Sequence, residues 1–498
     1  TSRDEAKESG LKWFPYNKGG AFRKWYGNNE RLVNWENDGF ELWNFKPAVI
    51  RNPTCYFKNG ITWAKVSSGK INARIFKKGF VFDSGAIAAF LENGKTLIEL
   101  QSYLNCVLAN EGLKFLTPTL NFTIKEIKQL PYKPITNPTT KQTIEETAQA
   151  LISLSKSDWD AYERSWDFKR HPLLTQDVQT NLLETSYKKL RQNWQAMTDQ
   201  MKELEEANNE LFINHYGLSG ELEKEVPLRE ISLTCNPHYR YPPNRSNPFD
   251  PKKAEKRLRE DTVKELISYG VGCVFGRYSL DKDGLILVSQ GETMDDYFKQ
   301  IPQPSFMLDE DNAVPILEEN WFADDLYARL EEFLKVAFGA EHLRDNLAFI
   351  KKALGKDLQK YLLKDFIKDH VQTYNKHPIY WLFSSPKKYF NLLIYMHRYT
   401  SSTLSVVLKY LREFKDKVNA EIESYRNLSV NASDSAEKTR ALKTLDKYSA
   451  IVRDLEEYEN KTIFPLASER MDIDLDEGVA VNYAKFGDAL YKIKGVNG

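Results

Sequence analysis

The sequence predicts an α+β protein, with a β-rich first part followed by a long helical spacer and a mostly α-helical C-terminal part. Two observations carry this prediction. Short runs of β-branched and aromatic residues, separated by turn signals such as Lys58-Asn59-Gly60, recur before residue 140. After residue 140, apolar residues recur at steps of three and four, the spacing of an amphipathic helix. We therefore expect four consecutive parts, over residues 1–140, 141–225, 226–320 and 321–498.

The first part contains four stretches with the composition of strands and one with the spacing of a helix. We expect strands within residues 47–57, 60–66, 70–76 and 79–85, and a helix within 97–110. Two more short strands are expected within residues 116–134, where Pro131 and Pro134 indicate the end of this part.

The rest of the chain reads as helices. A long helix is expected within residues 177–217, ending at Gly217, and another within 254–280, after an irregular segment rich in proline and asparagine. From Trp321 onward we expect helices almost throughout, with the apolar aromatics of 379–399 forming either a helical core or a partner surface. A helical hairpin is predicted by the periodic positions Leu404, Val407, Leu411, Phe414, Val418, Ile422 and Tyr425, followed by Leu442, Leu445, Tyr448, Val452 and Leu455.

Composition limits the class of protein. The 498 residues are 41% hydrophobic, 28% charged and 13% aromatic, which is typical of a folded globular protein with several cores. No apolar run reaches the roughly 18 residues that a membrane span needs. The four cysteines form no CxxC pair, which fits a reducing compartment. We expect a cytoplasmic protein without a membrane segment, and a piece of a longer chain because it starts without methionine.

Charge is distributed unevenly although the formal net charge is zero. Residues 1–140 contain 20 Lys and Arg against 12 Asp and Glu, a net charge of +8, and the remaining residues carry −8. A basic module joined to a mildly acidic body is typical of a protein in which one part faces a polyanion.

Catalytic and metal-binding motifs are not evident in the sequence. A glycine-rich phosphate or cofactor loop is absent, and the nearest stretch, 81–90, has one glycine and predicts a strand-to-helix turn. The NPHY stretch at 236–239 resembles the loop of amino-methyltransferases only superficially, because histidine replaces the second proline. The acidic runs 309–315 and 472–478 lack calcium-loop spacing and predict solvated turns. We expect no catalytic residue and no metal ligand.

Polar residues alternate with apolar ones between residues 61 and 76, which predicts a strand pair with one polar face turned outward. That face is either solvated or binds nucleic acid, and the net charge favours nucleic acid. On the second interpretation the outward residues Thr62, Lys65, Ser67, Ser68, Lys70, Asn72 and Arg74 contact bases, and the cations Lys12, Lys18, Arg23, Lys24, Lys77 and Lys78 contact phosphates. The ring-rich stretch around them, with Trp13, Phe14, Trp25 and Tyr26, is expected to form a hydrophobic seam toward a neighbouring domain.

Four long stretches, 12–28, 60–90, 377–400 and 476–490, resemble the C-terminal half of the PglX family, the adenine-specific DNA methyltransferases of BREX phage-defence systems. The resemblance implies a parent with an upstream domain that binds S-adenosylmethionine and carries an NPPY-type loop. This chain then begins at the target recognition domain, holds no cofactor and is not itself an enzyme. The β-rich part followed by helices also resembles the recognition domain and spacer of type I restriction specificity subunits.

Two hypotheses follow. In the first, residues 1–140 recognise a site on double-stranded DNA and present an adenine to the N-terminal methyltransferase domain of the same protein. In the second, the chain is mainly a scaffold that docks other BREX proteins through its helical domain.

Overall fold

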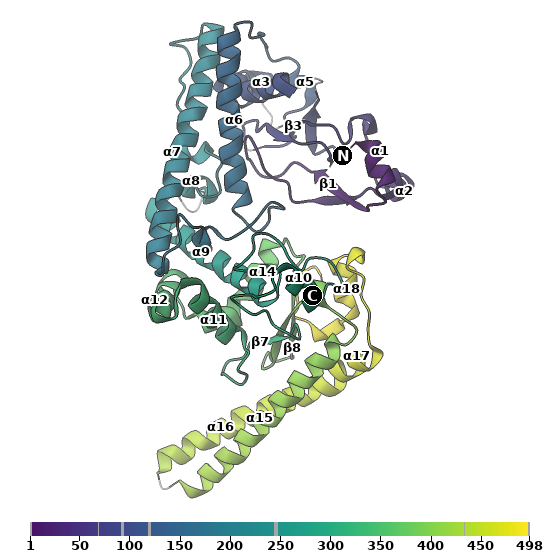
Figure 1. Cartoon of the computed structure of the whole chain (residues 1–498), viewed down its shortest axis with the longest axis vertical. Coiled ribbons are helices and arrows are strands. Elements are labelled where there is room, and N and C mark those ends of the chain that lie inside the picture. The colour runs from purple at the N-terminus through teal and green to yellow at the C-terminus, as the bar shows by residue number, and fades with distance from the viewer. Residues whose placement is uncertain are drawn as a thin grey trace. The chain divides into compact units, whose positions relative to one another are not determined.

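The computed structural model describes residues 2–67, 69–90, 94–117, 121–243, 248–432 and 434–496. The chain forms two compact units, each assembled from two separate stretches. Unit 1 comprises Thr1–Phe168 and Lys188–Leu258, and unit 2 comprises Lys169–Tyr187 and Arg259–Gly498. Both units combine helices with small sheets (Figure 1), so the predicted α+β class and the helical C-terminal region are confirmed.

Unit 1 contains two three-stranded sheets. In the first, β1 (Trp13–Asn17) lies between β2 (Leu32–Asn34) and β5 (Val81–Phe82), pairing antiparallel with β2 and parallel with β5. In the second, β3 (Gly60–Ala64) lies between β4 (Arg74–Phe76) and β6 (Ala86–Ala89), antiparallel to both. All five residues of β3 are buried, so both faces of this central strand are covered.

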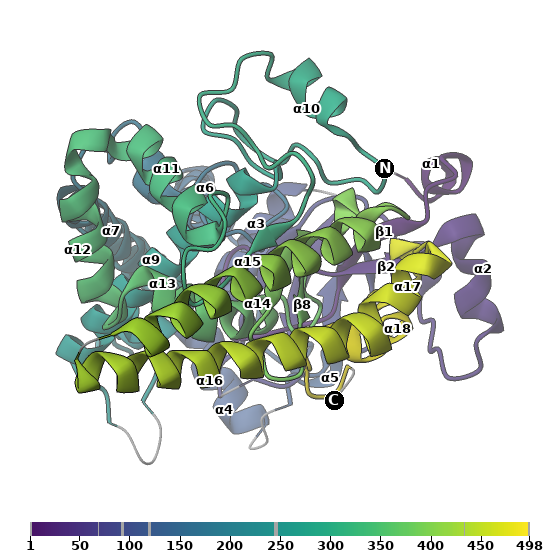
Figure 2. The same cartoon turned by 90° about the horizontal axis from the view of Figure 1, so that it is seen from below.

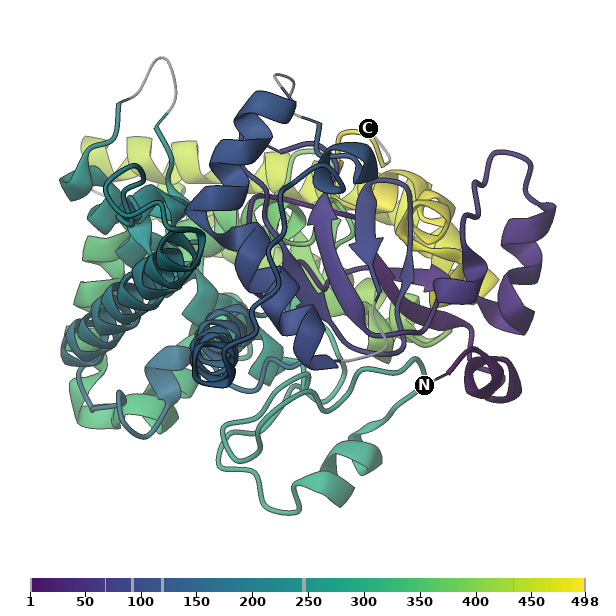
Figure 3. The same cartoon turned by 90° about the horizontal axis from the view of Figure 1, so that it is seen from above.

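Helices cover the second sheet. The helix α3 (Gly94–Asn105) packs on β3 and β4, and α4 (Val107–Leu116) follows it directly, as the blue helices beside the purple strands in Figure 3 show. Their shared core contains Trp63, Tyr103, Leu104 and Phe212. The predicted helix within 97–110 is therefore confirmed, divided in two at Cys106.

Long helices complete unit 1. They are α6 (Pro138–Asp160), which begins at an Asn137 cap, and α7 (Leu183–Tyr216), of which residues 188–216 belong to this unit. The 34 residues of α7 span about 51 Å at 1.5 Å per residue, and the helix ends before Gly217, whose φ of +71° suits glycine. The short helices are α1 (Arg3–Glu8), α2 (Glu36–Asn44), α5 (Ile124–Ile127) and α8 (Pro237–Arg240), and the first turns of α9 (Pro251–Val274) also belong to this unit.

Three local predictions for the first 140 residues were wrong. Within the described residues, 47–57 forms a 3₁₀ turn at Pro53–Cys55 instead of a strand. The expected strands of 116–134 are replaced, in the described part, by α5, which begins at a capping box between Thr123 and Glu126. The stretch 81–90 forms two strands around Gly85 instead of a strand and a helix.

Unit 2 has a small sheet surrounded by helices. The strand β9 (Asn391–Tyr395) lies between β7 (Val314–Pro315) and β8 (Tyr380–Ser384), antiparallel to both. Every residue of β8 and β9 is buried. The core interpretation of 379–399 holds, but the expected helix was wrong. The helices are α10 (Met294–Gln300), α11 (Leu326–Phe338), α12 (Leu343–Leu354), α13 (Leu358–Tyr361), α14 (Ile367–Thr373), α17 (Phe464–Glu469) and α18 (Val479–Lys485).

The predicted helical hairpin is confirmed. The helices α15 (Thr403–Asn431) and α16 (Ser435–Tyr458) lie side by side along their length (Figure 2). Leu411, Phe414 and Val418 of α15 are buried against Tyr448 and Leu455 of α16. The apolar seam that the sequence spacing indicated is therefore the contact between the two helices.

One acidic run differs from its prediction as a solvated turn. Asp309 is buried and accepts a hydrogen bond of 3.0 Å from the amide of Ala313. Burial, together with neighbouring Asp311, raises the pKa of Asp309 to about 6. A search of the described helices finds none that is both long and apolar enough to span a membrane.

Candidate nucleic-acid interface

Two of the predicted phosphate contacts, Arg23 and Lys24, are buried. The Arg23 guanidinium donates to the Asp158 carboxylate at 2.8 Å and to the carbonyl oxygen of Ser155 at 3.0 Å, both on α6. Asp158 also accepts hydrogen bonds from the amides of Thr234 and Cys235, at 2.7 and 2.9 Å. The guanidinium therefore holds its own segment against α6.

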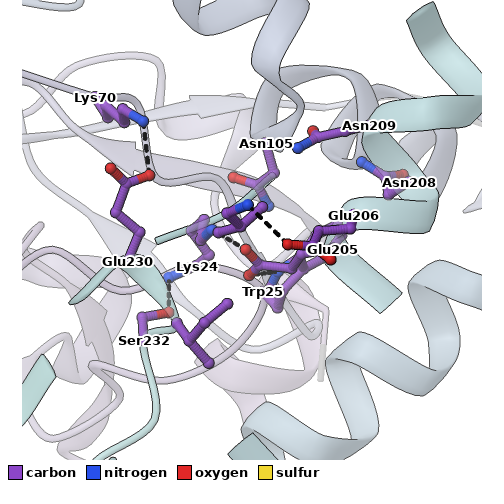
Figure 4. A network of polar contacts seen from close by, with 12 residues as sticks. Lys24, Trp25, Lys70, Asn105, Glu205, Glu206, Asn208, Asn209, Glu230 and Ser232 are labelled. Carbon is purple, nitrogen blue, oxygen red and sulfur yellow. Dashed lines mark hydrogen bonds and ion pairs between the residues drawn. The ribbon is translucent and has the colours of Figure 1, made fainter. Parts of the chain in front are cut away.

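The adjacent residue, Lys24, forms an ion pair with a different helix, α7. The ammonium group of Lys24 is paired with the carboxylate of Glu205 on α7, which also accepts a 2.9 Å hydrogen bond from the indole of Trp25 (Figure 4). The Lys24 amide donates to the Ser232 hydroxyl at 2.9 Å. Burial raises the pKa of Glu205, which Lys24 opposes.

Two predicted base-contacting residues are buried as well. Asn72 accepts a hydrogen bond from the amide of Ala64 at 3.2 Å and donates to the Ser67 hydroxyl at 3.2 Å. The Arg74 guanidinium donates to the carbonyl oxygen of Arg23 at 3.0 Å and to the Asn72 side chain at 3.2 Å. Burial lowers the pKa of Arg74 to about 10.

The outward orientation predicted for Thr62, Asn72 and Arg74 was therefore wrong. Because β3 is covered on both faces, polar residues beside it turn inward and bind the backbone instead of solvent. The ring-rich stretch is also turned inward: Phe14, Trp25 and Tyr26 are buried in unit 1, and Trp13 is 41% exposed.

The exposed predicted residues lie at the two ends of β3. At its C-terminal end lie Lys18, Lys65 and the partly exposed Ser67. The amide of Lys65 donates to the carbonyl of Gly85 at 3.1 Å, and the amide of Asp83 donates to the carbonyl of Asn17 at 3.2 Å, so three loops meet here. We call Lys18, Lys65 and Ser67 the loop cluster.

The other end of β3 carries a basic turn. Lys77 and Lys78 are exposed and follow β4, whose Phe76 pairs with Gly60 at the start of β3. The amide of Gly79 donates to the carbonyl of Phe57 at 3.2 Å. This contact brings exposed Lys58, which the sequence analysis missed, beside the turn. Lys58 belongs to the turn signal Lys58-Asn59-Gly60 beside a predicted strand, and this position could have indicated that it is exposed. We call Lys58, Lys77 and Lys78 the turn cluster.

Three further predicted residues complete the set. Lys12 is partly exposed, and its ammonium group lies 5.4 Å from the centre of the Trp13 ring. Lys70 forms an ion pair of 2.6 Å with Glu230, so its positive charge is compensated within unit 1 (Figure 4). Ser68 lies outside the described residues.

The NPHY stretch has a structural role. Asn236 is fully buried and caps α8 by accepting a 3.0 Å hydrogen bond from the His238 amide. Its amide group donates to the carbonyl oxygens of Leu228 and Ile231, at 2.7 and 2.9 Å. Over the described residues, no three His, Cys, Asp or Glu side chains are grouped to hold a metal ion.

Comparison with known proteins gives the class first: the chain is similar along its whole length to part of adenine-specific methyltransferases. The adenine-specific methyltransferase BrxX of Escherichia coli O9:H4 (strain HS) is 35% identical over 515 residues, covering 100% of this chain and 41% of that protein. The adenine-specific methyltransferase PglX of Lacticaseibacillus casei (strain Zhang) is 34% identical over 496 residues, covering 95% of this chain and 38% of that protein.

These matches confirm the resemblance to PglX. The chain spans about two-fifths of the length of the relatives it matches. No family model matches the chain.

Proposed function

We propose that this chain is the DNA-recognition part of a BREX adenine-specific DNA methyltransferase. It binds double-stranded DNA and presents the target adenine to a catalytic domain elsewhere in the whole protein, which uses S-adenosylmethionine. The observation that carries the proposal is the pair of exposed basic clusters at the ends of β3, in a segment with a net charge of +8. Similarity to adenine-specific methyltransferases supports DNA as the ligand.

The spacing of the two clusters suits a duplex. The four residue steps of β3 cover about 13 Å at about 3.3 Å per residue. The major groove of DNA is about 12 Å wide, with phosphates along both rims. Lysines at the two ends of β3 can therefore contact the two rims, while Ser67 and Lys65 reach toward base edges.

The buried ion pairs support the same role indirectly. Arg23, Lys24 and Arg74 fix the backbone that carries Lys18 and the strands that carry both clusters. A rigid backbone lowers the entropic cost of placing several side chains on a duplex at once.

The turn cluster gives a direct test. Changing Lys77 and Lys78 to glutamine is expected to weaken binding to all duplex sequences alike, because phosphates carry no base identity. The slope of log affinity against log salt should become shallower by about 1.8, since each lost phosphate contact accounts for about 0.9. Fluorescence anisotropy with labelled duplexes between low and physiological salt measures both quantities.

Lys438 and Lys443 of α16 supply the matched control, because both are exposed lysines in unit 2. Their double glutamine variant should retain the affinity and salt slope of the wild type. The proposal fails if the wild-type chain shows no salt-dependent duplex binding, or if both double variants lower the slope equally.

The scaffold function remains a second candidate because apolar side chains are exposed near the end of the hairpin. Leu428 is 37%, Val430 74% and Leu442 48% exposed. If this end docks another BREX protein, changing Val430 and Leu442 to serine should abolish co-purification with that protein while duplex binding persists. Unchanged co-purification would contradict the scaffold function.

A further inference from the structure

A second basic surface lies at the start of α9, in the part of the chain whose overall charge is acidic. Lys252, Lys253, Lys256 and Arg257 are all exposed there. Their spacing places Lys252 beside Lys256, and Lys253 beside Arg257, on successive turns of the helix. We call these four residues the α9 basic surface.

The carboxylates beside this surface are already engaged. Asp250 accepts hydrogen bonds from the amides of Lys252 and Lys253, at 2.9 and 3.3 Å, at the beginning of the helix. Glu255 accepts hydrogen bonds of 2.6 to 3.2 Å from Arg191 of α7. Among the residues that the structure describes, Lys252, Lys256 and Arg257 form no ion pair.

This arrangement is unfavourable for α9 itself. The first turn of α9 contains no acidic residue, so Asp250 just before it is the acid that meets the positive end of the helix dipole. Like charges four residues apart on a helix repel each other. A bound polyanion relieves this repulsion, so the charges complement an anionic partner better than they stabilise the helix.

Aromatic rings pack against exposed Arg257 of this surface and against the partly buried neighbour Arg240. The Arg257 guanidinium lies 4.7 Å from the centre of the Tyr241 ring, and Arg240 lies 5.7 Å from that ring. Arg240 also lies 5.4 Å from the centre of the Tyr162 ring. Stacking restricts the rotamers of the Arg257 guanidinium before a partner binds, and it is compatible with donation from the edge of that group to phosphate oxygens.

We propose that the α9 basic surface is a second contact region for the phosphate backbone of double-stranded DNA, in addition to the clusters at the ends of β3. This inference rests on the proposed DNA-binding function and extends it from the β-rich part to the helical part of unit 1. The arginine and lysine side chains would neutralise phosphates without reading bases, so they add affinity and leave sequence preference unchanged.

The test uses the full chain and a labelled duplex of about 30 base pairs, long enough to reach beyond one recognition site. Changing Lys252 and Lys256 to glutamine should make the salt slope shallower by about 1.8 and lower affinity about tenfold at physiological salt, equally for every sequence. The K438Q/K443Q variant is again the control. K256E, a single charge reversal, provides a second variant that should weaken binding at least as much as K256Q.

Each outcome decides the question. A wild-type slope in K252Q/K256Q, beside a reduced slope in K77Q/K78Q, overturns this inference and leaves the proposed function standing. A reduced slope in both double variants supports both. Absence of duplex binding by the wild-type chain refutes the proposed function and this inference with it. A change of sequence preference in K252Q/K256Q would also overturn the inference, because phosphate contacts cannot cause it.

Discussion

Replacing Asp158 with alanine is expected to lower the free energy of unfolding of unit 1 by about 3–5 kcal/mol. The reason is that removing one partner of a buried ion pair leaves the charge of the other uncompensated. Arg23 would remain buried with its charge uncompensated. The amides of Thr234 and Cys235 would also lose their acceptor. Urea unfolding followed by tryptophan fluorescence measures the change, and hydrogen exchange of residues 19–28 locates it.

A double variant separates the stranded charge from a general loss of packing. Replacing Arg23 with methionine in the Asp158→Ala background removes the unpaired charge and should recover part of the lost stability. Glu146, an exposed acid on the same helix, provides the control, and its alanine variant should unfold like the wild type. A loss below about 1 kcal/mol in Asp158→Ala would contradict the role assigned to this pair.

Lowering the pH from 7 to 5 is expected to destabilise unit 2 through two buried histidines, His171 and His370, and the partly buried His397. Burial lowers the pKa of His171 and His370 to about 3 and that of His397 to about 4. In the unfolded chain these groups titrate near 6.5. Below that pH these histidines bind protons in the unfolded state but not in the folded state, so the free energy of unfolding decreases as the pH falls. The loss is about 2 kcal/mol for each histidine at pH 5.

The geometry of His370 explains why the folded state keeps it neutral. Its Nε2 accepts hydrogen bonds of 3.1 Å from the amides of both Ile379 and Tyr380, at the start of β8. A proton on that nitrogen would remove both bonds. Asp309 acts in the opposite direction, because its raised pKa of about 6 makes the folded state the better proton binder between pH 6 and 4. It offsets roughly 1 kcal/mol of the loss at pH 5.

Urea unfolding at pH 7 and pH 5 measures this dependence. His397→Phe is the informative variant, since it keeps the ring against Tyr395 and removes one titrating group. It should lose about 2 kcal/mol less than the wild type between the two pH values. Equal losses in the two proteins would contradict the assignment of His397.

Elements with one solvent-exposed side could be predicted from the sequence, whereas elements that are buried on both sides could not. The α15–α16 hairpin was predictable because one side of each helix faces solvent, which leaves a period of three and four in the sequence. The strands β8 and β9 are buried on both faces, so they carry no alternation and resemble a buried helix segment.

The candidate site also contains some residues whose exposure could be predicted and others whose burial could not. Lys65, Lys77 and Lys78 could be predicted as exposed because they flank strands at turns. Arg23 and Lys24 could not be predicted as buried, since their partners Asp158 and Glu205 lie 135 and 181 residues further along the chain. An isolated cation in a sequence indicates a surface position by default, and only the fold supplies the compensating acid.

On the proposed function, the ion pairs of Arg23 with α6 and of Lys24 with α7 bear on which segment must be exchanged to transfer DNA recognition between related proteins. A graft limited to residues 1–140 would carry both cations without their acids, because Asp158 and Glu205 lie outside the grafted segment. Transplantation is therefore expected to succeed only when both acids are present in the recipient helices, or when the helices travel with the sheets. On the proposed function, the part of the chain that has to be exchanged to transfer recognition is therefore longer than the segment that contacts DNA.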